Sequence, residues 1–138
     1  MTSVNSAIAS SELLSEQGVE FVSAYHLATL TTMGKDGSFH VVPVGFTFVD
    51  GLARIIASGG TQKIKNIEAD SRVSICQVEG RRWLTLQGTA RIATDAESVA
   101  LGERLYEERY RPVRVNPERV VIEVTVNKVL GSSGMRAE

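Results

Sequence analysis

Alternating apolar and polar positions dominate this chain and are clearest near its end. Val120, Ile122, Val124 and Val126 recur at every second residue, which is the spacing of a strand with one buried face. Earlier β-rich runs carry many threonine, β-branched and aromatic residues. The sequence therefore predicts six strands, over residues 26–33, 39–49, 52–57, 72–78, 83–94 and 119–130.

Turn and helix signals separate these runs. Asp50 and Gly51 are typical of a tight hairpin turn, Gly88 of a bulge, and Pro43 of an edge strand or a bulge. Helical spacing and capping residues predict three helices: from Ser10 or Ser11 to about residue 24, from the glycines at 59–60 to about residue 69, and from Asp95 to about residue 110.

This order of elements favours a mainly β fold with flanking helices, an antiparallel barrel or closed sheet, over a doubly wound α/β fold. The 138 residues suit a single domain over residues 1–138, with residues 1–9 and 132–138 as loose tails.

Charge and composition argue against several classes of partner. The net charge is −1, so no broad positive field attracts nucleic acid or membrane, and no apolar run is long enough to span a bilayer. Cys76 is the single cysteine and cannot form an internal disulfide. No basic and then apolar leader is found. We therefore expect a cytoplasmic protein with no nucleic-acid partner and no membrane partner.

The segment after the strand at 52–57 has the most chemical content. Gly59 and Gly60 let backbone N–H groups approach a ligand, while Ser58, Thr61 and Lys63 add two hydroxyls and a charge. These residues would form a phosphate cradle at a helix N-terminus. The alternative is an ordinary glycine turn with Thr61 as the N-cap and Lys63 in water. The residues alone favour this alternative, because they match neither a P-loop nor a dinucleotide-binding motif.

Groups for acid–base or metal chemistry are scarce. His26 and His40 are the two histidines and belong to no cluster with metal-ligand spacing, so no metal site is predicted. His40 is interpreted as structural unless its strand lines a pocket. Arginines at 109, 111, 114 and 119 form a solvated face or an anion site, and the sequence favours the former. An anion cradle without acid–base groups is typical of a protein whose cofactor carries the chemistry.

Several motifs resemble the pyridoxamine-phosphate-oxidase-like split β-barrel superfamily. They are HLATLTT at 26–32, DGS at 36–38, HVVPVGF at 40–46, SGGTQK at 58–63 and RWLTLQG at 82–88. Within that superfamily the chain is most similar to small oxidoreductases that use the deazaflavin coenzyme F420, and among them to the biliverdin reductases. The segments RYRP at 109–112, NP at 116–117 and RVVIEV at 119–124 carry this closer resemblance.

The resemblance implies a homodimer of six-stranded antiparallel split β-barrels with two cofactor sites at the interface. It implies coenzyme F420 as the cofactor, with FMN as the alternative, because both carry a phosphate next to a ribityl chain. The implied contacts come from a strand beside the deazaflavin ring, a phosphate-binding segment and a segment of the other subunit. They are His40, Val42, Pro43, Val44 and Gly45; Ser58, Gly59, Gly60, Thr61, Gln62 and Lys63; and Gly80, Arg81, Arg82 and Trp83. No catalytic residue is implied.

The implied activity is hydride transfer from reduced F420 to a conjugated tetrapyrrole, with biliverdin giving bilirubin. Two alternatives are an FMN-binding oxidoreductase of the same fold and a non-catalytic module that binds a flavin or a haem derivative. Arg82 and the arginines of residues 109–119 either pair with propionates of the substrate or lie on the surface.

Overall fold

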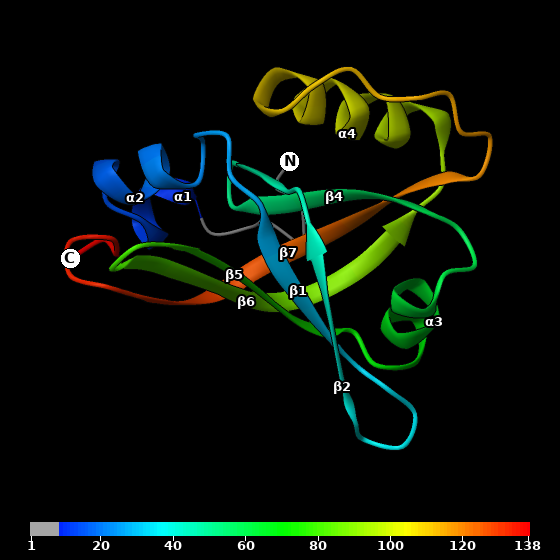
Figure 1. The fold of residues 1–138 in the computed structure, drawn as a ribbon, viewed down its shortest axis with the longest axis horizontal. Helices are drawn as coiled ribbons and strands as arrows, with labels where there is room; N and C mark the ends of the chain where they lie inside the picture. The colour runs from blue at the N-terminus through cyan, green and yellow to red at the C-terminus, as the bar shows by residue number, and fades with distance from the viewer. Residues whose placement is uncertain (1–8) are drawn as a thin grey trace, which may run out of the picture.

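The computed structural model describes residues 9–138 and places seven strands in one sheet (Figure 1). Their order is β2-β1-β5-β6-β7-β4-β3, and each neighbouring pair runs antiparallel. The predicted mainly β antiparallel fold is therefore confirmed. The strands are β1 (Ala28–Met33), β2 (Phe39–Val44), β3 (Thr47–Val49), β4 (Leu52–Ser58), β5 (Arg72–Glu79), β6 (Arg82–Ala93) and β7 (Arg119–Gly131).

The seventh strand arises because the run predicted at 39–49 is broken in two. Gly45 and Phe46 separate β2, which pairs with β1, from β3, which pairs with β4 at the opposite end of the sheet order. A Cβ atom on Gly45 would lie 3.0 Å from Tyr106 Cε2 and 3.1 Å from Tyr110 Cε2, so a larger residue would press on both rings. Phe46 is buried in the core. This short break therefore joins the two ends of the sheet.

Three local predictions about the strands are confirmed. Asp50 and Gly51 have positive φ angles of 54° and 78°, as a tight turn between β3 and β4 requires. Gly88 lies at the register shift between β6 and β7, where an added Cβ atom would lie 1.9 Å from Thr125 O. Pro43 belongs to β2, which is the first strand in the sheet order and has a free edge.

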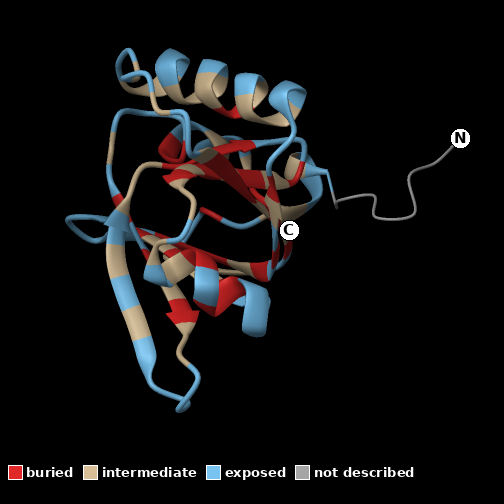
Figure 2. Cartoon of the chain, turned by 90° about the vertical axis from the view of Figure 1, so that its right-hand side faces the viewer, coloured by how far each residue is buried: buried red, intermediate tan, exposed pale blue. Residues whose placement is uncertain are grey.

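Helices flank the sheet on different sides. α3 (Gln62–Ala69) buries Ile64 and Ile67 in the core. α4 (Ala96–Arg109) lies against β4 and β7, and its start is capped as predicted, since the Asp95 carboxylate accepts from Ser98 N–H. In Figure 2 the buried residues concentrate in the strands beneath α4, and the hairpin of β1 and β2 extends away from them. No helix within residues 9–138 is both long and apolar enough to cross a membrane.

The N-terminal helix predicted from Ser10 is in fact two short helices, α1 (Ser10–Leu13) and α2 (Glu16–Phe21). They are separated because Leu14 is extended and bridges to Arg136, after which the Ser15 hydroxyl accepts from Gly18 N–H and caps α2. Of the tail predicted at 1–9, all but the last residue lies outside the described residues.

The loose tail predicted at 132–138 is wrong. The Met135 side chain is 0% exposed and belongs to the hydrophobic core. Backbone hydrogen bonds from Ser132 N–H to Trp83 O and from Ala137 N–H to Leu13 O hold the segment against the body. Burial of Met135, together with these hydrogen bonds, therefore holds a segment that contains no other large apolar residue.

Candidate active site

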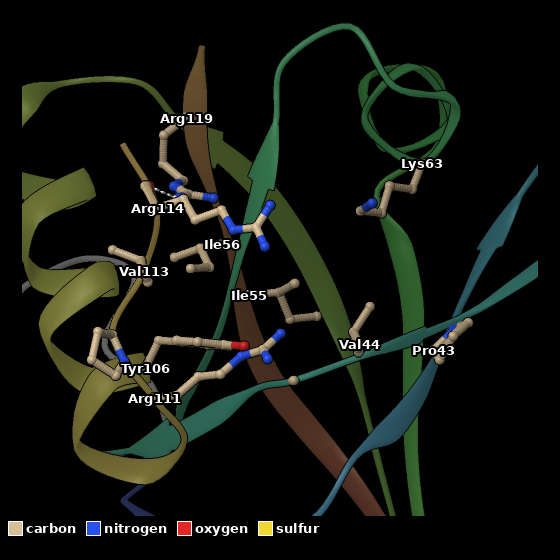
Figure 3. Close-up of a pocket in the computed structure, with 12 residues that line it drawn as sticks. Pro43, Val44, Ile55, Ile56, Lys63, Tyr106, Arg111, Val113, Arg114 and Arg119 are labelled. Atoms are coloured by element: carbon tan, nitrogen blue, oxygen red, sulfur yellow. Dashed lines mark hydrogen bonds between the residues drawn. The ribbon is translucent and has the colours of Figure 1, made fainter. Parts of the chain in front are cut away.

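A cavity of about 430 Å³ opens where the sheet is incomplete. β3 pairs only with residues 52–54 of β4, so among the described residues the rest of β4 pairs with β7 alone. The cavity lies between this unpaired edge, the end of β2, the start of α3 and the loop after α4 (Figure 3). It is lined by Pro43, Val44, Gly45, Ile55, Ile56, Lys63, Tyr106, Arg111, Pro112, Val113, Arg114 and Arg119.

The charged side chains of this lining are all cationic. Lys63 reaches the cavity from α3, whereas Arg111, Arg114 and Arg119 reach it from the opposite wall (Figure 3). Arg119 is engaged within the fold, since its guanidinium donates to Glu103 Oε2 at 3.1 Å and to Arg114 O at 2.7 Å. Within residues 9–138 the other three side chains have no ion-pair partner. This lining favours an anionic ligand.

The start of α3 is open to an anion. Thr61 is the N-cap residue, but its hydroxyl donates to Ser58 O at 3.0 Å and does not cap the helix. Gly60 has a φ of 81°, which turns the chain from β4 into the helix. The capping bond expected for an ordinary glycine turn is thus absent among the described residues, and Lys63, in the first turn of α3, extends its ammonium into the cavity. Free helix N–H groups beside a cation are suited to a phosphate.

Gln62 is used inside the fold. Its Nε2 donates to Asn66 Oδ1 at 2.8 Å, and Asn66 Nδ2 donates to Thr32 Oγ1 at 3.0 Å. Asn66 and Thr32 are buried, so this chain of hydrogen bonds fixes α3 to β1. The predicted contact of Gln62 with a cofactor therefore competes with a structural hydrogen bond.

Two hydrogen bonds join the glycine turn to the loop that carries the arginines. Asn116 Nδ2 donates to Ser58 Oγ at 2.7 Å, and Gly59 N–H donates to Glu118 O at 2.8 Å. The two walls of the cavity are therefore fixed to each other at one end.

The end of β2 forms the third wall. Pro43, Val44 and Gly45 line the cavity, as a strand beside a ligand must. His40 and Val42 lie on the same face of β2 as Val44, because side chains alternate along the strand. His40 Nδ1 is buried and has no hydrogen-bond partner among the described residues. Neither His40 nor Val42 lines the cavity, but His40 has unused hydrogen-bonding capacity on the face of β2 that carries Val44, since most buried polar atoms are satisfied.

Arg109, the last residue of α4, is not part of the cavity. Its guanidinium donates to Ala24 O and to Gln77 Oε1, each at 2.8 Å, to His26 O at 3.3 Å and to Phe46 O. It also lies 4.7 Å from the centre of the Phe46 ring. Burial lowers the pKa of the Arg109 guanidinium, and the neighbouring Tyr110 opposes this shift. Of the arginines predicted at 109–119, Arg109 is therefore engaged within the fold and is not available as an anion site.

Tyr110 completes this arrangement. Its hydroxyl donates to His26 O at 2.7 Å and accepts from Phe46 N–H at 3.2 Å. Burial raises the pKa of the Tyr110 phenol above its usual value, and the positive charge of Arg109 partly offsets the shift. We call Arg109, Gln77 and Tyr110 the anchor cluster, because they tie the end of α4 to the break between β2 and β3.

The hairpin between β5 and β6 does not reach the cavity within one chain. Gly80 and Arg81 form its turn, while the Arg82 guanidinium pairs with Glu79 and lies 5.0 Å from the centre of the Phe21 ring. Trp83 is 37% exposed. The expectation that these residues reach the cofactor of another subunit stays a prediction.

The sequence and the fold together settle the family. Residues 14–133 match the family described as pyridoxamine 5'-phosphate oxidase. The chain belongs to this family. The chain is 46% identical over 124 residues to the F420H(2)-dependent biliverdin reductase of Mycobacterium tuberculosis (strain CDC 1551 / Oshkosh). That match covers 88% of this chain and 90% of the relative.

Solved structures support the fold. A protein described as F420 reductase superposes with a TM-score of 0.71 at 22% identity, over 83% of this chain and 97% of that one. A conserved hypothetical protein from Mycobacterium tuberculosis superposes with a TM-score of 0.74 at 20% identity, over 95% of this chain and 89% of that one. At these identities the likeness concerns the fold alone.

Sequence reasoning missed several residues that line the cavity. The sequence predicts only that Ile55 and Ile56 belong to a strand and that Tyr106 belongs to a helix, whereas all three line the cavity. The position of Ile55 and Ile56 just before the glycine turn is the local signal that could have placed them at the cavity. No local signal marks Tyr106, because its role depends on Gly45, 61 residues earlier in the chain.

Proposed function

We propose that this protein is an F420H2-dependent reductase that converts biliverdin to bilirubin. The observation that carries the proposal is the 46% identity, over 88% of the chain, to an enzyme of that name. The geometry supports it, because two of the three chain segments implied for the cofactor meet at one cationic cavity, to which they contribute Pro43, Val44, Gly45 and Lys63.

The residues present fit a phosphate-bearing cofactor. Lys63 and the uncapped first turn of α3 would hold its phosphate, with Ser58 and Gly60 shaping the approach. When bound, reduced F420 supplies a hydride to the substrate. The apolar wall of Val44 and Ile55 would exclude water next to the ring.

The role of the chain in catalysis is then one of holding and orienting. The lining of the cavity contains no carboxylate, and solvent can provide the proton. Positioning two bound molecules in one geometry contributes much of the barrier reduction in such reactions. The fixed walls described above supply that rigidity.

We further propose that the protein works as a homodimer. The outer face of β2, β1, β5 and β6 exposes large apolar side chains in a single chain: Phe39 is 74% exposed, Val41 55% and Val78 54%. The register pairs Val41 with Thr31, Thr31 with Ser74, and Val78 with Trp83. Ser74 and Val78 lie on the same side of β5, so these side chains share one face of the sheet. Such a face is suited to a second copy, whose Trp83 would lie within the contact.

The test mixes the purified protein with F420H2 and biliverdin, and follows cofactor oxidation and bilirubin formation by absorbance. We expect both to proceed together and F420 to bind more tightly than FMN. Tight FMN binding without detectable F420 binding would favour an FMN-dependent enzyme instead. Binding of both ligands without turnover would indicate a non-catalytic binding module.

Light scattering after size exclusion tests the dimer. A species of twice 15.0 kDa is expected. A 15.0 kDa species that still binds the cofactor would exclude a site shared between subunits.

A further inference from the structure

Two guanidinium groups of the cavity are unused by the fold. Arg111 and Arg114 are exposed residues on the loop after α4, and neither side chain has an ion-pair partner within residues 9–138. Both point from the loop toward the middle of the cavity, and Lys63 points toward them from the opposite wall (Figure 3). In the proposed function, contacts with the cofactor phosphate need only the Lys63 wall. The positive charges of Arg111 and Arg114 therefore remain for another anion.

The loop that carries these arginines is held in place on both sides. Val113 N–H donates to Glu107 Oε2 at 2.9 Å, and Arg114 O accepts from the Arg119 guanidinium at 2.7 Å. Pro112 further restricts the backbone between the two arginines. The backbone that carries the pair is therefore ordered before a ligand binds, which leaves only side-chain freedom to be lost on binding.

The chemistry of the two walls differs. A guanidinium presents a planar fork of N–H donors that matches a carboxylate, whereas the lysine ammonium acts as a point charge on phosphate. Biliverdin carries two propionate carboxylates, on the two rings that flank its central bridge. Two free guanidinium groups on one wall therefore match two carboxylates on one substrate.

We infer that Arg111 and Arg114 bind the two propionates of the tetrapyrrole, while the Lys63 wall binds the cofactor phosphate. This inference rests on the proposed function. It separates these two residues from Arg109 and Arg119, which the fold already engages. It assigns them a substrate-specificity role, because a tetrapyrrole without free carboxylates would lose both contacts.

The experiment measures binding, so it does not depend on turnover. Arg111→Ala, Arg114→Ala and the double variant are titrated with biliverdin and with biliverdin dimethyl ester, in which the carboxylates are blocked. Arg104→Ala is the matched control, because Arg104 is an exposed arginine of α4 that does not line the cavity. F420 is titrated separately, and thermal melting shows that each variant is folded.

We expect each single variant to weaken biliverdin binding by about tenfold or more, as the loss of a charge-assisted contact does. The dimethyl ester should bind the wild type weakly, and the variants should bind it no worse than the wild type does. Affinity for F420 should be unchanged, and Arg104→Ala should behave as the wild type.

Three results would overturn the inference. The first is equal affinity of the wild type for biliverdin and its dimethyl ester. The second is loss of F420 affinity in the variants with biliverdin affinity intact, which would assign the arginines to the anionic tail of the cofactor. The third is wild-type protein that binds no biliverdin. If wild type binds biliverdin through both arginines but never reduces it, the proposed function fails and the inference stands.

Discussion

Arg109 and Arg111 are two residues apart in the chain, yet the molecule uses them in opposite ways. Arg109 turns into the fold and donates to three backbone carbonyls and the Gln77 amide. Arg111 turns into the cavity and is left for a ligand. The anchor cluster and the cavity wall thus begin at the same helix end, where Arg109 supports the structure and Arg111 lines the cavity.

The difference between Arg109 and Arg111 shows that the residues that line the cavity are separate from the residues that hold its walls in place. The anchor cluster holds the break at Gly45 and Phe46, and this break ends β2 at the cavity. The cavity wall can then expose charge without weakening the fold, because none of its free cations completes a structural contact. Changes in the anchor cluster should therefore be read first in stability, and changes in the cavity wall first in affinity.

The largest effect is expected from Arg109→Ala. It removes the donor to Gln77 Oε1 and to the carbonyls of Ala24, His26 and Phe46, several of which are part-buried. Unsatisfied buried groups and lost charged hydrogen bonds make a loss of about 3–5 kcal/mol in the free energy of unfolding reasonable. Urea denaturation measures it.

Arg104→Ala is the control, with an expected change within about 0.5 kcal/mol, as for an exposed position without partners. A folded Arg109→Ala protein of normal stability but poor ligand affinity would contradict the division, since Arg109 would then act as a binding residue.

The sequence predicts local features of this molecule but not the separation between the anchor cluster and the cavity wall. The Asp50 and Gly51 turn, the Asp95 cap and the Gly88 bulge were predictable, because each depends on residues close together in the chain. The position of Lys63 after two glycines was likewise a local signal, and the structure places it at the cavity.

The different fates of Arg109 and Arg111 were not predictable. Gln77, one partner of Arg109, lies 32 residues away, and Phe46 lies 63 residues away. The burial of Met135 in a polar tail is a similar case, because it depends on a core formed by distant strands. The sequence identifies which residues are charged, but tertiary packing determines whether a charged side chain is engaged within the fold or left exposed in the cavity.

An intermediate effect is expected from Lys63→Ala, now in affinity. Loss of a charge-assisted contact with phosphate should cost about 1.5–3 kcal/mol of binding free energy, or about one to two decades in the dissociation constant for F420. Stability in urea should stay near the wild-type value. Fluorescence titration of the cofactor measures the loss.

Lys65→Ala provides the comparison, because Lys65 is an exposed lysine on the same helix that does not line the cavity. Unchanged F420 affinity in Lys63→Ala, with the protein folded, would remove Lys63 from the binding site.

The smallest effect is expected from Tyr110→Phe, which keeps the ring over Gly45 and removes only the hydroxyl that donates to His26 O. We expect a loss of about 1 kcal/mol in the free energy of unfolding at neutral pH, with F420 affinity unchanged.

Because burial raises the folded-state pKa of Tyr110 above its unfolded value near 10, the native state favours the protonated phenol. This contribution is fully present below pH 10 and is lost as the pH rises through the folded-state pKa. The stability difference between wild type and Tyr110→Phe, measured by urea denaturation, should therefore be constant from about pH 7 to 9 and shrink above about pH 10. A difference that does not change with pH would show that the hydroxyl is not held as a buried donor, and the anchor cluster would then reduce to Arg109 and Gln77.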